Sequence, residues 1–443
     1  MRAVKSLRRS LFVCLVVAAA LPAAGAAKAK PTPVIFVHGG SGSAQQFESD
    51  AMRFTSNGFP QGRLFAYEYD TSGSSNDAAI ANLDGFIASV KAATGAAQVD
   101  VLAHSRGTTV MHTYLGSSPE RAASVRRYVN FDGRTAASPP GGVPTLAIWG
   151  EGDPGRVIGG AENVRFPNKA HTEVTTSRES FAAVYEFLNG APPETRNVLP
   201  EKPSKVTVSG RALNFPANQG AEGGLLEVYE LDSATGARRG PALRSLIIGA
   251  DGAFGPLKLN GRKRYEFALT RAGSDYTVHN YPEPFERDDH FYRVLDAPPL
   301  RPFVEQGPNH TNVTVTRMRE FWGDGADPGF VDSLLVDGTE VINPQTAPRR
   351  RRVIAVFNFD KNADGVSDTS ASLSPFSSLA FLTGVDLHIP ASPDASGTVP
   401  VTETIRGNRR HTVTTNVPDW PATGHTVSVF FKDYPAKAYK KKD

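Results

Sequence analysis

The chain is almost without cysteine, which excludes several kinds of chemistry. Its 443 residues include a single cysteine, Cys14, close to the N-terminus. If that segment is removed on export, the mature protein has no disulfide, no thiolate metal ligand and no cysteine nucleophile. Val13 is too large for a lipobox, so we expect no lipid anchor at Cys14.

Long hydrophobic runs are also absent, apart from one at the N-terminus. The run 11–21 follows a basic start and precedes Ala24-Gly25-Ala26. It is too short to span a bilayer, and this order is typical of a secretory signal. We therefore expect a signal peptide over 1–26, no transmembrane segment and a secreted protein, with the periplasm as the alternative. Arg8-Arg9 matches a twin-arginine signal only in part.

Charge of one sign is scarce. Lys and Arg number 48 against 45 Asp and Glu, for a net charge of +3. This balance predicts no nucleic-acid partner. The short basic runs 349–352 and 440–442 are typical of solvated turns, and the second predicts a basic tail over 437–443.

The first half of the chain alternates strands and helices. Apolar runs predict strands and amphipathic periodicity predicts helices, and this alternation predicts a mainly parallel sheet with helices on both faces over 31–198. Thr176 and Glu179 predict a capping box for the last helix, and Gly190 its end. The predicted strands are 33–40, 62–70, 99–103, 126–132, 145–150 and 163–167, and the predicted helices are 77–95, one from 108, and 176–190.

The second half changes to a period of two, with many turn residues and no convincing helix. We expect a linker over 191–203, then all-β domains, built as barrel or sandwich, over 204–297 and 303–436. The proline-rich segment 296–303 separates them, although one long β domain fits the same pattern. We expect the histidines of this half to lie at the surface.

The stretch "VDVLAHSRGT" carries the candidate nucleophile, Ser105. A hydrolase serine on a tight strand-to-helix turn needs small residues two places before and after it, here Ala103 and Gly107. The helix that follows turns its N-terminal amides toward a developing negative charge. Upstream, "FVHGG" ends in glycines, and we expect the backbone amides of Gly40 and Arg106 to form an oxyanion hole. A glycine turn without a role is the alternative for "FVHGG".

His171 is the candidate general base. It is the histidine that follows the last predicted strand of the parallel sheet and precedes its last helix. We expect His104 to pack behind the serine turn and His112 to be structural. Two acids fit the chain order, Asp132 after the next strand and Asp153 after the one beyond, and topology alone favours Asp153.

These motifs resemble the secreted bacterial and archaeal lipases that join an α/β-hydrolase domain to a C-terminal β-barrel. The resemblance implies Ser105 as nucleophile, His171 as base and Asp132, in "NFDG", as acid. We therefore take Asp132 and keep Asp153 as the alternative. The resemblance rests on the stretches "FVHGGSGSAQQFESDAMRF", "FAYEYDT", "VDVLAHSRGT", "SSPERAASV", "NFDG", "GVPTLAIWG", "SRESFAAVYEFLNG" and "YPEPFERDD".

The predicted function is that of a lipase or esterase that cleaves acyl esters through an acyl-enzyme, without a cofactor. Lipases of this kind can carry a helical lid after "EYDT", but the segment 72–95 holds only one helix. An open pocket and a preference for short or medium acyl chains follow. The Arg106 side chain either borders the substrate or points to solvent. An esterase acting on a polyester or an acylated polysaccharide is the alternative, and a non-catalytic surface-binding protein is a distant one.

The segment "DKNADGVSD" resembles the first half of a calcium loop. Its oxygen ligands alternate around Gly365, at Asp360, Asn362, Asp364 and Asp368. The twelfth position is Ala371, so the bidentate ligand is missing. A polar β-hairpin turn explains the same residues.

Overall fold

The computed structural model describes residues 30–325, 328–408 and 411–436. The predicted signal peptide and the basic tail lie outside the described residues. Within them, no helix combines the length and the apolar character needed to cross a membrane. From Thr32 onward the described residues form one compact unit.

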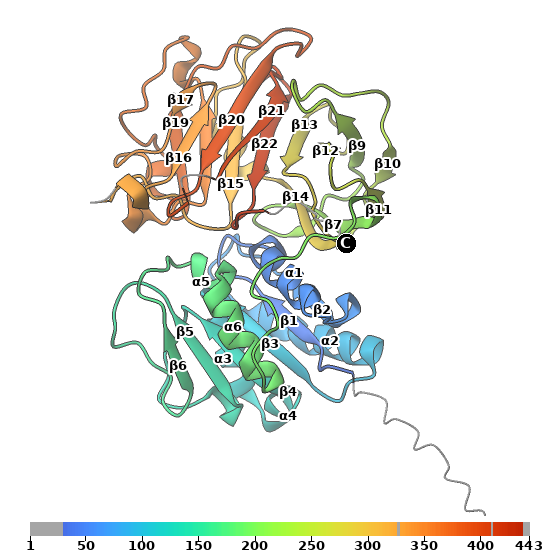
Figure 1. The fold of residues 1–443 in the computed structure, drawn as a ribbon, viewed down its shortest axis with the longest axis vertical. Helices are drawn as coiled ribbons and strands as arrows, with labels where there is room; N and C mark the ends of the chain where they lie inside the picture. The colour runs from blue at the N-terminus through green and yellow to red at the C-terminus, as the bar shows by residue number, and fades with distance from the viewer. Residues whose placement is uncertain (1–29, 326–327, 409–410, 437–443) are drawn as a thin grey trace, which may run out of the picture. The chain divides into compact units, whose positions relative to one another are not determined.

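A six-stranded sheet organises the first half of the chain (Figure 1). Every neighbouring pair in it is parallel, which confirms the predicted α/β fold. Its order is β2-β1-β3-β4-β5-β6, with β1 Val34–Val37, β2 Leu64–Tyr67, β3 Val99–His104, β4 Val125–Phe131, β5 Thr145–Trp149 and β6 Glu162–Arg165.

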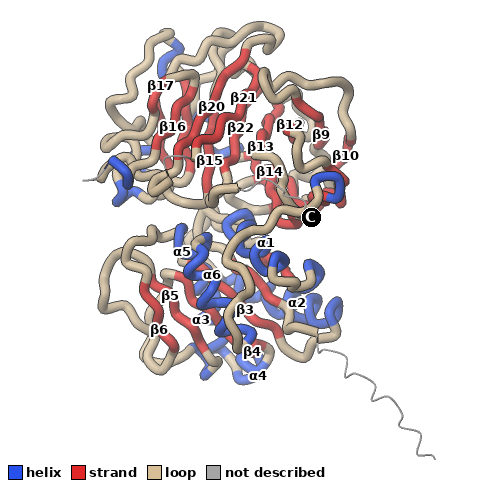
Figure 2. The backbone as a smooth tube through the Cα atoms, viewed as in Figure 1, coloured by secondary structure: helices blue, strands red, loops and turns tan. Residues whose placement is uncertain are grey.

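Helices cover both faces of this sheet (Figure 2). Alternate residues of β1 point to opposite faces, so Phe36 packs in a core cluster with Phe54 of α1, and Val37 in one with Val110 of α3. The helices are α1 Glu48–Ser56, α2 Asp77–Thr94, α3 Arg106–Ser117, α4 Pro119–Ala123, α5 Glu173–Thr176 and α6 Arg178–Asn189.

Two local details differ from the prediction. Helix α1 was not predicted, because most of it is buried, polar residues included, and it shows no simple apolar stripe. The cap of α6 is Ser177, whose side chain accepts a hydrogen bond from the Ser180 amide; Thr176 belongs to α5 instead. Gly190 ends α6 in the left-handed conformation, as predicted.

Three sheets make up the second half. An eight-stranded sheet has the order β10-β9-β12-β13-β22-β15-β18-β19, and two four-stranded sheets are built on β11-β7-β14 with β8 and on β17-β16-β20-β21. The strands are β7 Val206–Asn214, β8 Gln219–Gly220, β9 Leu225–Leu231, β10 Arg244–Ile247, β11 Ala253–Leu259, β12 Arg264–Thr270, β13 Thr277–Pro282, β14 Asp289–Asp296, β15 Val313–Arg317, β16 Ser333–Val336, β17 Thr339–Glu340, β18 Ala355–Phe359, β19 Leu382–Asp386, β20 Thr398–Thr404, β21 Thr412–Pro418 and β22 His425–Phe431.

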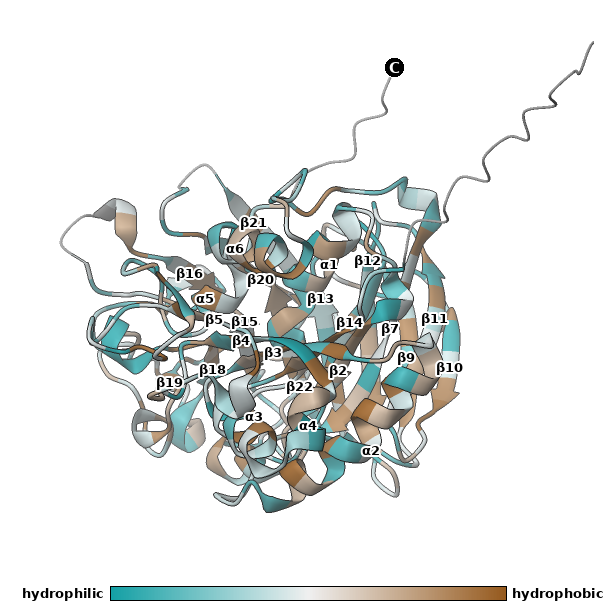
Figure 3. Cartoon of the chain, turned by 90° about the horizontal axis from the view of Figure 1, so that it is seen from below, coloured by the Kyte–Doolittle hydropathy of each residue, from teal (hydrophilic) through white to brown (hydrophobic). Residues whose placement is uncertain are grey.

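The eight-stranded sheet continues across the segment that the sequence offers as a domain boundary. Strand β13 pairs in parallel with β22, and β22 in turn with β15. One core cluster accordingly combines Tyr281 with Val313 and Val427. The strands carry both hydrophilic and hydrophobic residues (Figure 3), and burial alternates along β7, β15 and β22, as the period of two predicts, whereas every residue of β13 is buried.

The expectation that the histidines of this half lie at the surface is wrong for two of them. His279 is 1% exposed and His310 2% exposed. The Nδ1 atom of His279 lies 2.6 Å from a Glu266 carboxylate oxygen, and its Nε2 atom lies 2.9 Å from Nδ1 of His425. The parallel pairing of β13 with β22 buries His279, and a pairing so distant along the chain leaves no local signal in the sequence.

Candidate active site

Ser105 occupies a strained turn between β3 and α3. Its φ of 50° and ψ of −119° lie where residues other than glycine rarely occur. The Ser105 amide donates to the carbonyl oxygen of Phe131 on β4, which ties the turn to the sheet. The turn therefore holds the serine side chain at the carboxyl edge of the sheet, at the start of a helix.

Close backbone approaches explain the glycines around this turn. A Cβ on Gly107 would lie 2.5 Å from the carbonyl oxygen of His38, and a Cβ on Gly39 would lie 3.1 Å from Cβ of Ser105. The small residues around Ser105 therefore have a direct steric cause, because the loop 38–42 packs directly against the serine turn. We call this loop the oxyanion loop, after the role that the sequence predicts for it.

Asp132 and His171 are in contact. The Nδ1 atom of His171 lies 2.6 Å from Oδ2 of Asp132. The other Asp132 oxygen, Oδ1, accepts from the Gly150 amide at 2.8 Å and pairs with Arg156 at 2.9 Å. Burial raises the pKa of Asp132, but His171, the Gly150 amide and Arg156 outweigh it and hold the pKa below its usual value. The carboxylate is therefore kept ionised beside the imidazole.

Asp153, the alternative acid, lies elsewhere. Its side chain is exposed and accepts a hydrogen bond from the Gly155 amide within its own loop. The structure thus brings Asp132, and not Asp153, to His171. Position after a strand places both acids at the same edge of the sheet, and only the packing of the loops separates them.

Ser105 lines a small pocket together with Gly40, His104 and Thr172, the residue after His171. The Arg106 amide is the first of α3, a position whose N–H has no acceptor within its own helix. Gly40 lies next to Arg106, because a Cβ on Gly40 would lie 3.5 Å from Cδ of Arg106; an oxyanion hole formed by their two amides stays a prediction.

The side chain of Arg106 is held by hydrogen bonds and does not point freely into solvent. Its guanidinium donates to the side-chain oxygen of Asn76 at 2.7 Å and to the carbonyl oxygens of Thr71, Gly73 and Ser75. Arg106 therefore fixes the loop after β2, and a position beside the substrate stays a prediction.

A second layer of polar contacts supports the oxyanion loop. The Gln46 side-chain oxygen accepts from the Gly39 amide at 3.1 Å, and its nitrogen contacts His104 Nδ1. His104 Nε2 donates to the carbonyl oxygen of His171 at 2.8 Å. Burial lowers the pKa of His104, so this histidine is neutral and packs behind the turn, as predicted.

The second half of the chain, which we call the β region, also contacts the oxyanion loop and the residues that follow β2. Glu68 pairs with Arg293 of β14 at 2.7 Å and lies 3.3 Å from His38. Burial raises the pKa of Glu68, but Arg293 and His38 outweigh it and lower the pKa. Asn218, from the turn after β7, donates to the carbonyl oxygens of Gly42 and Tyr69.

The β region contacts the loop of His171 as well. The buried carboxylate of Glu320 accepts hydrogen bonds from the amides of Thr172 and Glu173, at the N-terminus of α5. The ring of Phe381 stacks on the imidazole of His171, with centroids 5.8 Å apart and planes at 15°. Neither residue could be predicted as a neighbour of His171, because no local feature of the sequence links Glu320 or Phe381 to a histidine far earlier in the chain.

An ion network lies next to Glu320. Glu173 pairs with Arg406 at 2.6 Å and with Arg319 at 3.1 Å. Burial raises the pKa of Glu173, but Arg319, Arg406 and Lys169 outweigh it and lower the pKa to about 2. This network ties the His171 loop to the last part of the β region.

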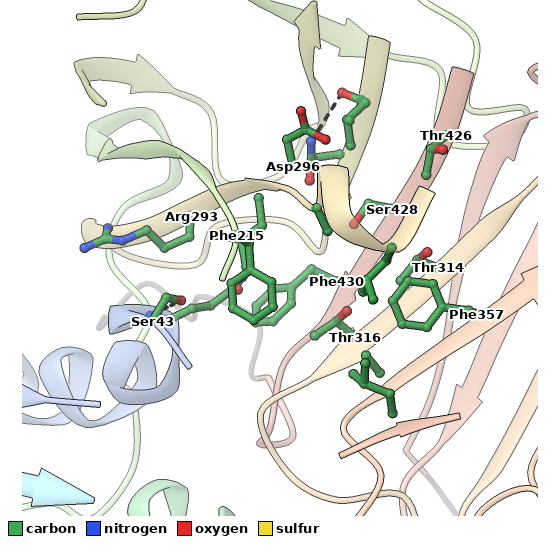
Figure 4. A pocket seen from close by; sticks show the side chains of 18 of the residues that line it. Ser43, Phe215, Arg293, Asp296, Thr314, Thr316, Phe357, Thr426, Ser428 and Phe430 are labelled. Carbon is green, nitrogen blue, oxygen red and sulfur yellow. Dashed lines mark hydrogen bonds between the residues drawn. The ribbon is translucent and has the colours of Figure 1, made fainter. Parts of the chain in front are cut away.

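The absence of a helical lid does not leave the serine open. Helix α2 is the one helix between β2 and β3, as predicted, but Met318, Ile354 and Phe381 of the β region line the Ser105 pocket. The same three residues also line a larger cavity of about 150 Å³ against the eight-stranded sheet (Figure 4). Side chains of the β region therefore cover part of the pocket that the sequence predicts to be open.

The calcium-loop residues are engaged within their own turn. Asp360 accepts from the Asp364 and Gly365 amides and lies 2.8 Å from His388 Nδ1, and Asp364 accepts from the Val366 amide. Asn362 has a φ of 65°, and Asp368 accepts from the Ser370 amide. In the described part of the chain, no three His, Cys, Asp or Glu side chains are grouped to hold a metal ion. These residues form a polar turn, but the predicted hairpin is wrong, because β18 before the turn and β19 after it pair in parallel.

Family models match three consecutive parts of the chain. Lipase (class 2) matches residues 31–119, the lipase C-terminal domain matches 204–299, and a further C-terminal domain model matches 300–435. A search of curated proteins gave no match.

Several solved structures are similar in fold over part of the chain. A Listeria innocua gene product has a TM-score of 0.29 and 13% identity over 38% of this chain and 97% of its own. Aspergillus fumigatus lipase B has a TM-score of 0.32 and 14% identity over 40% and 56%. A Bacillus licheniformis lipase in its propeptide form has a TM-score of 0.29 and 10% identity over 89% and 94%. These TM-scores are low, so the assignment of the α/β fold rests on the strand order of the parallel sheet and not on these similarities.

Proposed function

Because the chain is a lipase-like α/β-hydrolase with C-terminal β domains, we propose that it is a serine carboxylic-ester hydrolase with Ser105, His171 and Asp132 as its triad. One observation carries the proposal. The Asp132 carboxylate lies 2.6 Å from His171 Nδ1, at the sheet edge where Ser105 occupies its strained turn.

Each residue has a defined role in acylation. His171 Nε2 takes the proton of the Ser105 hydroxyl as Oγ attacks the ester carbonyl carbon. The carbonyl oxygen becomes negative and accepts hydrogen bonds from the amides of Gly40 and Arg106. When the intermediate collapses, the bond to the alcohol oxygen breaks, and His171 returns the proton to the leaving alcohol. Asp132 holds the imidazole in the required tautomer throughout.

Water completes the cycle. It attacks the acyl carbon of the acyl-enzyme while His171 takes one of its protons, and the acid leaves as that proton returns to Ser105 Oγ. The products are one alcohol and one carboxylic acid, and every proton transfer uses a residue of this chain.

The acyl part of the substrate occupies the cavity against the eight-stranded sheet. Met318, Ile354 and Phe381 line both this cavity and the Ser105 pocket, so a chain esterified at Ser105 can extend along them. An acyl chain that fills the cavity removes more apolar surface from water than acetate does. The missing helical lid predicts a preference for short and medium acyl chains, whereas the cavity favours chains long enough to fill it. We propose that the cavity determines the preferred chain length.

A panel of p-nitrophenyl esters tests this function. We expect Ser105→Ala to abolish turnover of every ester, and kcat/KM to rise from acetate through the medium-chain esters. A fluorophosphonate probe should label Ser105 in the wild type, as peptide mass spectrometry shows. Equal turnover by the Ser105→Ala variant, or labelling at another serine, would contradict the triad; a fall in kcat/KM with chain length would contradict the acyl site.

We also propose that the protein is exported. The basic start, the apolar run 11–21 and the small residues before position 27 support this proposal. N-terminal sequencing of the protein recovered from the culture medium should begin after residue 26. Recovery only inside the cell, with the N-terminus intact, would contradict it.

A further inference from the structure

The cavity next to the serine pocket has an uneven lining. Many of its residues are apolar, including Phe215, Leu295 and Phe430. One wall, however, carries hydroxyl and carboxamide groups. We call Asn312, Thr314, Thr316 and Ser428 the polar strip; all four line the cavity.

Strand alternation places the strip on one face of the eight-stranded sheet. Val313 and Val315 of β15 are buried in the core, whereas Thr314 and Thr316 are half-buried and lie on the opposite face. Ser428 of β22 is the register partner of Thr314. Figure 4 shows Thr314, Thr316 and Ser428 on these two strands, near Phe357 and Phe430.

The groups of the strip lack partners. In the described part of the chain, no hydrogen bond joins the hydroxyls of Thr314, Thr316 or Ser428 to another protein group. The side-chain oxygen of Asn312 is buried without a partner, and the residue is only 4% exposed, while its nitrogen donates to the carbonyl oxygen of Glu305. A buried acceptor without a donor is unfavourable, but protein atoms cover this oxygen, so the polar groups that the strip presents to the cavity are the hydroxyls of Thr314, Thr316 and Ser428.

The strip also has a direction. Successive residues on one face of a strand are about 6.6 Å apart. Met318 follows just beyond the end of β15 and lines both this cavity and the Ser105 pocket. An acyl chain that starts at Ser105 and follows β15 therefore passes Met318 first, then Thr316, Thr314 with Ser428, and finally Asn312.

We infer that the cavity binds acyl chains that carry hydroxyl groups along their length, and that the preferred substrates are esters of hydroxylated fatty acids. This inference rests on the proposed ester hydrolysis. A hydroxyl on the chain exchanges hydrogen bonds with the hydroxyls of Thr314, Thr316 and Ser428. A plain alkyl chain would expel water from the strip and leave these groups unpaired, which weakens binding.

The test compares plain dodecanoate with its mid-chain hydroxy and ω-hydroxy analogues, all as p-nitrophenyl esters. We expect kcat/KM for at least one hydroxylated ester to exceed that of the plain ester by about tenfold, the effect of roughly 1.4 kcal/mol at the transition state. Thr314→Val and Ser428→Ala should each lower this ratio. Thr414→Val is the matched control, because Thr414 is an exposed strand threonine outside the cavity lining, and it should leave the ratio unchanged.

The outcomes separate the inference from the function it rests on. Equal turnover of plain and hydroxylated esters overturns the inference and leaves ester hydrolysis intact; it means that water satisfies the strip. A preference that survives in both strip variants also overturns it. If no ester is hydrolysed, the proposed function fails. The Ser105→Ala variant then tests the cavity by calorimetry, which must show tighter binding of hydroxydodecanoic than of dodecanoic acid.

Discussion

Replacing Asp132 by Asn is the sharpest test of the site, because the structure fixes how the new side chain must lie. Oδ1 of Asp132 accepts from the Gly150 amide and from Arg156, so the carbonyl oxygen of an asparagine keeps this place. The amide NH₂ then takes the place of Oδ2 and donates to His171 Nδ1. This puts the imidazole proton on Nε2, which can no longer accept the proton of Ser105.

The expected loss follows from that tautomer. Asp132→Asn should lower kcat by about 10⁴-fold, equivalent to about 5.5 kcal/mol, and leave the residual rate that the oxyanion hole and binding supply. The assay is kcat and KM for a medium-chain p-nitrophenyl ester, with a thermal melt to show that the variant is folded. Asp153→Asn is the matched control and should retain kcat within about twofold, since it removes only an exposed loop contact. An active Asp132→Asn beside an inactive Asp153→Asn would refute the assignment.

Three further predictions concern the surroundings of the triad. The pKa of Glu173 falls from 4.5 to about 2 on folding, so its ionised form contributes stability above pH 4.5 that is lost as the pH falls toward 2. At about 1.36 kcal/mol per unit this is about 3 kcal/mol, and urea unfolding of Glu173→Gln at neutral pH should show that loss and a weaker dependence on acid. Glu320→Gln should lower kcat by about 10- to 100-fold with little change in KM, because one charge-assisted hydrogen bond to the His171 loop is lost, and Glu320→Asp should restore part of kcat. Equal effects on KM and kcat would contradict that role. Gly107→Ala would place Cβ 2.5 Å from the His38 carbonyl oxygen, and a melt should show destabilisation above about 2 kcal/mol; a wild-type melt would contradict the steric account.

Local patterns in the sequence predict much of the first half of the chain, residues 31–198, which we call the hydrolase half. The six strands and the helices α2, α3 and α6 follow from apolar periodicity, whereas α1, α4 and α5 do not; the parallel sheet follows from the alternation of strands and helices. The serine turn is predictable because its sterics act within a few residues: Ala103 and Gly107 are small since the strand and the oxyanion loop lie directly against them. Features whose cause is local are the ones that sequence reasoning finds.

The choice of acid shows where that reasoning ends. Asp132 and Asp153 both follow strands of the same sheet, so topology places both at one edge. What distinguishes them is that Gly150 and Arg156 hold Asp132 against His171, while Asp153 turns to the Gly155 amide. These contacts depend on loop packing. General topology alone favours Asp153, whereas the resemblance to secreted lipases favours Asp132, the residue that contacts His171.

The contributions of the β region could not be predicted at all. Glu320 and Phe381 reach His171, and Asn218 and Arg293 reach the oxyanion loop, across separations that leave no pattern in the chain. Burial of a charge such as Glu320 is unfavourable unless its partners are in place. The sequence shows a glutamate, and only the fold shows the two amides that make its burial tolerable.

These contacts bear on how the two halves divide the work. Under the proposed function, the hydrolase half supplies the reacting groups, whereas the β region holds the His171 loop through Glu320 and lines the serine pocket through Met318, Ile354 and Phe381. The cavity takes its lining from both halves, because Ser41, Gly42, Ser43 and Gln45 line it together with strands of the β region. We expect substitutions at Thr314 and Thr316, on the half-buried face of β15, to change which acyl chain is accepted without touching Asp132 or His171. The cavity combines residues that lie far apart in the chain, so its preference could not be predicted from the sequence.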